Sequence, residues 1–169
     1  MEGLKTVAEL MCVAARTAPK SAGRDYIETV ILEGEAIARL AADMCAYGEE
    51  SGKRNFDRDA ANVAQCPVVV LIGLADVKPL GLNCGACGAA RCIACNTYEG
   101  EFRGPACALH LLDLGIALGS AVKTAAMLCA DNRIMYRIGV SARRLGLCRS
   151  DVVMGIPLSA TGKSIFFDR

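Results

Sequence analysis

The stretch Val68-Val69-Val70-Leu71-Ile72-Gly73-Leu74 decides the fold of this chain. It is a continuous run of β-branched and aliphatic residues, which is typical of a strand that is covered on both faces. A strand of this kind lies inside a sheet, with packed layers on either side. We therefore expect a sheet with residues 68–74 near its centre and helices on its faces.

Helical and extended patterns continue on both sides of this strand. Apolar residues recur at the helical period over residues 4–18, and Pro19 ends that helix because it disfavours the α conformation at the preceding residue. The other expected helices span residues 34–48, 56–64, 107–130 and 134–145, and the other expected strands span residues 26–32, 151–156 and, at a sheet edge, 165–167. We expect Asp131 and Asn132 to form a turn that caps the last helix. With 169 residues, of which 53% are apolar, the chain suffices for a single domain over residues 1–169.

The charge balance argues against two classes of partner. Nineteen basic residues against 18 acidic ones give no support for binding to nucleic acid or to a membrane surface, and the lack of Trp argues against stacking on single strands. The charge-poor run at residues 104–122 is about as long as a membrane span, but His110 and Asp113 lie within it. A buried helix is the better interpretation, and we expect neither nucleic acid nor membrane as a partner.

Five of the ten cysteines lie within residues 83–107, a glycine-rich segment that is short of large apolar residues. Two residues separate Cys84 from Cys87, and four more separate Cys87 from Cys92. Three thiolates on one loop are a tripod for an iron–sulfur cluster, and Cys107 could fold back to supply the fourth. The intervening glycines permit positive φ and leave amides free to hydrogen-bond to the cluster. The spacing predicts one [4Fe–4S] cluster on these four cysteines.

Zinc is the alternative for the same segment. Read with Cys95, the segment contains two Cys-x2-Cys pairs, which is a zinc-binding pattern. Zinc ribbons usually separate their pairs by about 15–20 residues, whereas four residues separate these. The short separation favours the cluster. Cys95 itself could replace Cys92 or Cys107 as a ligand, or take no part.

A disulfide framework is a third interpretation of the cysteines. Glu2 and Lys5 lead into an amphipathic segment and not into the apolar region of a signal peptide, so we expect a cytoplasmic protein with reduced thiols. The remaining cysteines are scattered among Ala, Met, Val and Leu and are expected to be small buried hydrophobes: Cys12, Cys45, Cys66, Cys129 and Cys148.

Two polar turns could hold an anion such as a phosphate. Residues 20–25 combine a serine, free amides and two basic side chains, although an ordinary solvated turn explains them equally well. Residues 158–164 end in Gly162-Lys163-Ser164, but this is not a P-loop, because Pro157 stands where the upstream glycine belongs.

The long helical pattern at residues 107–130 carries a stripe of small residues, Gly115, Gly119 and Ser120. Such a stripe lets another backbone approach closely, which suggests a partner helix from a second subunit and hence a homodimer. His110 is interpreted as a satisfied core histidine, and Asp113 is expected to bond to a nearby group.

The whole chain resembles a family of uncharacterised ferredoxin-domain proteins from anaerobic bacteria and archaea. The segments that carry the resemblance are residues 14–20, 81–88 and 113–121, together with the end of the chain over residues 155–159 and 167–169. The resemblance implies cluster ligands at Cys84, Cys87, Cys92 and Cys107, and it leaves Cys95 as an extra.

The order of elements is also similar to that of flavin-dependent nitroreductases. Ala18-Pro19-Lys20-Ser21 resembles their Ala-Pro-Ser loop beside flavin mononucleotide (FMN), and residues 66–70 resemble their Ala-Pro-aliphatic central strand. The arginine-rich opening of that family is absent ahead of Leu4, and Lys20 interrupts the loop motif. The resemblance implies candidate FMN contacts at Arg16, Pro19, Ser21, Arg24 and Lys163.

Together these expectations describe an α+β, nitroreductase-like domain with a mixed or antiparallel sheet, flanking helices and an iron–sulfur insert at residues 80–107. Its expected role is electron transfer as an oxidoreductase, between the cluster, a bound flavin and an unknown redox protein or small-molecule acceptor. The alternatives are a ferredoxin-like carrier without flavin and a metal-stabilised adaptor without enzymatic activity. The sequence identifies no general acid, base or nucleophile.

Overall fold

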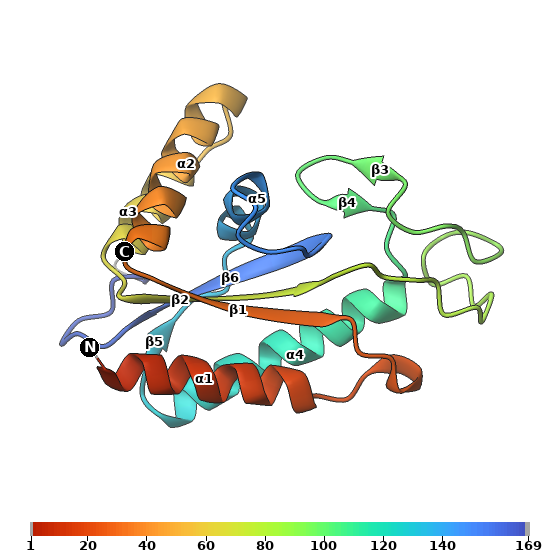
Figure 1. Cartoon of the computed structure of the whole chain (residues 1–169), viewed down its shortest axis with the longest axis horizontal. Helices are drawn as coiled ribbons and strands as arrows, with labels where there is room; N and C mark the ends of the chain where they lie inside the picture. Colours follow the sequence, from red (N-terminus) through yellow and green to blue (C-terminus); the bar gives the residue numbers. More distant parts are fainter. Residues whose placement is uncertain (1, 168–169) are drawn as a thin grey trace.

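The computed structural model describes residues 2–167 and has an α+β fold (Figure 1). Its helices are α1 (Glu2–Thr17), α2 (Glu35–Ser51), α3 (Phe56–Ala64), α4 (Ala108–Met127) and α5 (Tyr136–Arg144), with a 3₁₀ turn η1 (Ser21–Gly23). Its strands are β1 (Ile27–Glu33), β2 (Val68–Leu74), β3 (Tyr98–Glu99), β4 (Arg103–Gly104), β5 (Asp131–Asn132) and β6 (Val152–Ser159). The predicted fold class is confirmed: α1 and α4 cover one face of the larger sheet, and α2, α3 and α5 cover the other.

The larger sheet has the order β1-β2-β6-β5, and each neighbouring pair runs antiparallel. β2 lies inside it, and all seven of its residues are buried. Because side chains alternate along a strand, Val70 and Ile72 join the core with α1 and α4, whereas Val69 and Leu71 join the core with α2, α3 and α5. The prediction of an inner strand covered on both faces is confirmed.

The chain after β6 differs from the sequence-based expectation. β6 continues to Ser159, and β5 pairs with its end at the sheet edge. Residues 165–167 form bends, and Arg133 Nη1 donates to the Phe166 carbonyl at 3.3 Å. The predicted edge strand at 165–167 is wrong because β5, which was expected to be a turn and helix cap, pairs with that edge. The residue that precedes α5 and caps it is Met135.

α4 is only in part the buried helix that its composition predicted. Leu114 and Ala121 on its inner face are buried with α1 and the sheet, but Leu112 on its outer face is 62% exposed and Ile116 is 45% exposed. An apolar composition cannot tell which side of a helix meets the core, so the prediction is wrong for the outer face. Among residues 2–167, α4 is also the one helix that is long and apolar enough to cross a membrane, and 39% of that window is buried. Because core helices pass the same test of length and composition, this is weak support for a membrane span.

Gly139 of α5 is required by close packing against β6. A Cβ at this position would lie 1.9 Å from the Val153 carbonyl oxygen, a backbone atom that can move only if the strand moves. We expect Gly139→Ala to lower the free energy of unfolding by about 3 kcal/mol, as overpacked core substitutions do. Urea unfolding measures this change. The control is Gly3→Ala on α1, where a Cβ meets no atom within 4 Å; equal midpoints for the two variants would contradict the packing argument.

Candidate metal centre

Residues 80–107 leave the sheet after β2, return at the start of α4 and project from one end of the molecule (Figure 1). Polar contacts hold this segment on the core. The Arg103 amide donates to the Asp151 carbonyl at 2.9 Å, and its guanidinium pairs with the Asp151 carboxylate at 3.3 Å. Asn96 Nδ2 donates to the Val77 carbonyl at 3.3 Å. The cysteines of the segment are therefore carried on a loop that is tied to the sheet.

The four predicted ligands line one small cavity. Cys84, Cys87 and Cys92 come from the projecting segment and are exposed, whereas Cys107 is the residue that precedes α4 and is partly buried. The fold-back of Cys107 toward the loop is the arrangement that the sequence predicted. The structure thus brings together sulfurs from a loop and from a core helix.

Two glycines shape the wall of this cavity. Gly85 has φ of +73° and Gly88 has φ of +87°, which are conformations that residues with a Cβ rarely adopt. The Gly88 amide donates to the Gly85 carbonyl at 2.9 Å and closes a turn around Cys87. A Cβ at either glycine would meet no atom within 4 Å. Their contribution is therefore conformational.

Asn83 orients one of the sulfurs, a role that was not predicted from the sequence. Its amide donates to Cys92 Sγ at 3.3 Å, and the Cys92 amide donates to Asn83 Oδ1 at 2.9 Å. Asn83 has φ of +51°, a conformation that Asn tolerates better than most residues. An amide hydrogen bond to sulfur stabilises a thiolate and tunes the metal that it binds. An Asn directly before the first cysteine was the available signal.

The donor set of the cavity consists of four cysteine thiols, the residue type that binds iron–sulfur clusters. Each iron of a [4Fe–4S] cluster takes one cysteine thiolate, so the four sulfurs must surround a space. Among the described residues, no group of three or more Cys, His, Asp or Glu side chains is already arranged to hold a metal ion. Four thiols around one cavity, with an amide bonded to one sulfur, are what a cluster would need of this chain.

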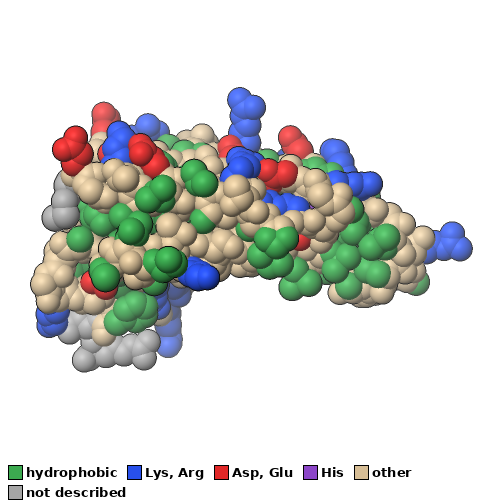
Figure 2. Space-filling view, turned by 90° about the horizontal axis from the view of Figure 1, so that it is seen from below, with side chains coloured by type: hydrophobic (Ala, Val, Ile, Leu, Met, Phe, Trp, Pro, Cys, Tyr) green, Lys and Arg blue, Asp and Glu red, His purple; other side chains and the backbone are tan. Residues whose placement is uncertain are grey.

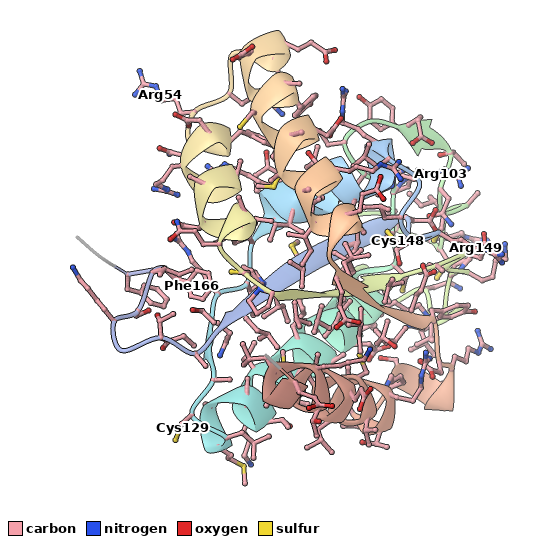
Figure 3. All side chains as sticks on the ribbon, turned by 60° about the vertical axis from the view of Figure 1, so that its left-hand side comes forward. Arg54, Arg103, Cys129, Cys148, Arg149 and Phe166 are labelled. Carbon is pink, nitrogen blue, oxygen red and sulfur yellow. The ribbon has the colours of Figure 1, made fainter. Side chains whose placement is uncertain are left out.

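Cys95 also lies beside this cavity. It is partly buried, and it lines a small adjoining cavity together with Cys87, Cys92 and Cys107. The other cysteines are dispersed, as expected. For example, Cys129 lies just after α4, and Cys148 packs against the core on the face of the sheet that α2, α3 and α5 cover (Figure 3). The expectation that all of these five are buried is confirmed for Cys66 alone: Cys12 and Cys148 are partly buried, and Cys45 and Cys129 are exposed.

Cys66 is the cysteine that burial changes most. Burial raises the pKa of the Cys66 thiol to about 12, because the charged thiolate would be desolvated. Since the thiolate is the reactive form, we expect iodoacetamide at pH 8 to modify Cys66 in the folded protein at least about a hundredfold more slowly than Cys45. Mass spectrometry of the labelled peptides measures both rates. Rapid labelling of Cys66 before denaturant is added would contradict its burial.

A buried polar network connects the start of α4 to the turn after α1. The Ser21 amide and hydroxyl both donate to Asp113 Oδ1 at 2.9 Å, and Asp113 Oδ2 lies 2.9 Å from His110 Nδ1. His110 is fully buried, Asp113 is 3% exposed, and the Tyr26 ring packs edge-on against His110 at 4.9 Å. The expected bonding of Asp113 is confirmed. His110 is bonded at Nδ1, while its Nε2 has no hydrogen-bond partner within residues 2–167.

The turn after α1 uses most of its donors within the chain. Arg16 Nη1 pairs with Asp25 Oδ2 at 2.8 Å and also donates to the Ile27 carbonyl. Both donors of Ser21 are taken by Asp113. Pro19 and Arg24 are exposed beside them. Four of the predicted FMN contacts therefore lie at the end of α1 and in the connection that follows it, but Arg16 and Ser21 already have partners.

Lys163 lies away from those four residues. The sheet register aligns Ile27 of β1 with Leu74 of β2 and Val152 at the start of β6, so the turn after α1 lies at that end of the sheet. Lys163 follows the opposite end of β6, beyond Ser159. The structure thus does not bring Lys163 to the other candidate FMN contacts within one chain, and their role in binding FMN stays a prediction.

Comparison with solved structures identifies the fold. The FMN-dependent nitroreductase NfnB from Mycobacterium smegmatis in complex with NADPH is 13% identical, with a TM-score of 0.62 over 94% of this chain and 78% of that chain. A putative nitroreductase in complex with FMN from Desulfovibrio desulfuricans is 12% identical, with a TM-score of 0.61 over 97% and 78%. A nitroreductase-like family protein from Bacillus cereus is 12% identical, with a TM-score of 0.62 over 95% and 76%. The fold is therefore nitroreductase-like.

Comparison of sequences identifies the family. Residues 103–169 match the model for an uncharacterized protein containing a ferredoxin domain (DUF2148). An uncharacterized protein from Archaeoglobus fulgidus is 50% identical over 171 aligned residues, which cover 99% of this chain and 92% of that protein. The chain belongs to this family of uncharacterised ferredoxin-domain proteins.

Proposed function

We propose that the protein is an electron-transfer oxidoreductase that carries one [4Fe–4S] cluster on Cys84, Cys87, Cys92 and Cys107. The observation that carries this proposal is the single cavity that these four cysteines line. Membership of a ferredoxin-domain family and the nitroreductase-like fold support an oxidoreductase role. We also propose that residues 80–107 act as a cluster-binding insert within one domain, since β2 before it and α4 after it pack into the same core.

The chain's own residues would bind the cluster, tune it and leave it open to a partner. Four thiolates would hold it, and the Asn83 amide would hydrogen-bond to one of them. A bound cluster supplies one-electron transfer. Hydrophobic side chains gather at the end of the molecule that carries residues 80–107 (Figure 2). Within this segment, Leu82, Ile93 and Tyr98 are exposed. A redox protein or a small acceptor could approach the cluster there.

Iron and sulfide analysis tests the cluster against the zinc-bound adaptor. Anaerobically purified protein should contain about four irons and four acid-labile sulfides per chain. One zinc per chain without sulfide would favour the adaptor and overturn the proposal. All ten cysteines are free thiols in the structure, which supports our proposal of a reducing, cytoplasmic location.

FMN is a separate part of the proposal, and it is supported by the shared fold. Of the three solved proteins compared above, one is an FMN-dependent nitroreductase and another was solved in complex with FMN. The turn after α1 fits a phosphate poorly as it stands, because Arg16 and Ser21 are engaged by Asp25 and Asp113. Flavin fluorescence of the supernatant after acid precipitation tests this part. About one FMN per chain would support it, and a cluster without flavin would identify a ferredoxin-like carrier.

We propose that the outer face of α4 forms a homodimer interface. Leu112 and Ile116 are exposed there, and the space above Gly115 and Gly119 is open, so a second helix can approach closely. We expect Ile116→Asp to raise the dimer dissociation constant at least about tenfold, because it would bury an unpaired charge. Sedimentation velocity over a concentration series measures this constant.

A matched substitution separates this interface from general surface effects. Tyr98→Asp replaces another exposed apolar residue, on β3, and should leave the dimer intact. A wild-type chain that sediments as a monomer at every concentration would overturn the proposed homodimer. An Ile116→Asp variant with the same dissociation constant as the wild type would overturn the proposed interface.

A further inference from the structure

The cysteine-rich segment holds five thiols around two adjoining cavities. Cys87, Cys92 and Cys107 line both of them. Cys84 is the fourth cysteine that lines the first cavity, and Cys95 is the fourth cysteine that lines the second. Either cavity therefore offers a set of four cysteines, and the two sets differ in one member.

The two exchangeable cysteines lie in different surroundings. Cys84 is exposed, whereas Cys95 is partly buried and packs against the core that contains α1 and α4. Cys87, Cys92 and Cys107 lie beside both of them, because these three cysteines line both cavities.

We propose that Cys95 is an alternative ligand of this site, which exchanges with Cys84 as the fourth thiolate of the bound iron–sulfur cluster. This inference rests on the proposed function. In the exchange, the iron–sulfur bond to Cys84 breaks as the bond from Cys95 forms; the proton leaves the Cys95 thiol and is taken up by Cys84, and the irons keep their oxidation state. The exchange moves the fourth ligand from the exposed side of the segment to the side that packs on the core.

Single and double substitutions test the exchange. Cys84→Ala, Cys95→Ala, the double variant and Cys87→Ala are reconstituted anaerobically with iron and sulfide, with Cys45→Ala on α2 as the control. We expect each of Cys84→Ala and Cys95→Ala to keep at least about half of the wild-type iron and the electron paramagnetic resonance (EPR) signal of a four-iron cluster. The double variant and Cys87→Ala should lose that signal. Circular dichroism confirms that each variant is folded.

Thiol protection reports the ligand directly. In Cys84→Ala, loading with the cluster should slow iodoacetamide labelling of Cys95 at least about tenfold relative to the cluster-free protein, because a metal-bound thiolate cannot react. A folded Cys84→Ala variant with as little iron as Cys87→Ala would overturn the proposal, as would unchanged labelling of Cys95 on loading. A wild-type protein that takes up neither iron nor sulfide would instead overturn the proposed function, and this inference with it.

Discussion

Cys87→Ala is expected to reduce the iron and acid-labile sulfide of the anaerobically purified protein to less than about one tenth of the wild-type four per chain. Cys87 lines both cavities of the cysteine-rich segment, so neither set of four thiols is complete without it. No other thiol on its turn can substitute, because Gly85, Ala86 and Gly88 are its neighbours. Iron and sulfide analysis on protein of known concentration measures the loss.

The control for this variant is a cysteine that is exposed and lies away from the segment. Cys45→Ala on α2 should keep the full iron content, since Cys45 lines neither cavity. Because Cys87 is exposed on a projecting loop, its replacement should leave the circular dichroism spectrum unchanged. A Cys87→Ala protein that retains four irons would show that Cys87 is not a ligand of the cluster.

Asp113→Ala is expected to lower the free energy of unfolding by about 3 kcal/mol. The carboxylate is buried and bonds to the Ser21 amide, the Ser21 hydroxyl and His110. Its removal leaves the fully buried His110 Nδ1 and two donors of the partly buried Ser21 without this partner, and unsatisfied buried groups are costly. The same contacts fix the turn after α1 to the helix that begins beside Cys107. Urea unfolding of the metal-free protein gives the difference directly.

Two control variants separate the effect of the hydrogen-bond network on stability from the effect of removing a carboxylate charge. Asp113→Asn keeps an acceptor at the same place and should recover part of the lost stability. Glu9→Ala removes an exposed carboxylate from α1 and should change the unfolding free energy by less than about 0.5 kcal/mol. If Asp113→Ala and Glu9→Ala unfold at the same urea concentration, the network does not stabilise the fold.

The hydrophobic pattern of the sequence was sufficient to predict the elements whose environment is uniform. The residues of β2 are aliphatic and buried throughout, so the predicted strand at 68–74 has the observed bounds. α3 has a clear apolar face, and its predicted bounds of 56–64 are also those observed. The outer face of α4 could not be predicted in this way, because its residues are as apolar as those of the buried face.

The candidate site was likewise predictable from the sequence only in part. Cysteine spacing was sufficient to predict four thiols that share a cavity. Three of them lie on one loop, and the chain after this loop is long enough to bring Cys107 back to it. The contact of Ser21 with Asp113 joins residues that are 92 positions apart, so no local pattern could predict it. Lys163 was grouped with the turn after α1 by resemblance, whereas the sheet register places it beyond the opposite end of β6.

The absorption and EPR spectra of anaerobically prepared protein, recorded before and after dithionite, test the cluster most directly. A [4Fe–4S] cluster on Cys84, Cys87, Cys92 and Cys107 predicts a brown protein whose visible absorption bleaches on reduction and returns on reoxidation, with an EPR signal in the reduced state. A colourless protein that shows no change with dithionite would contradict the account.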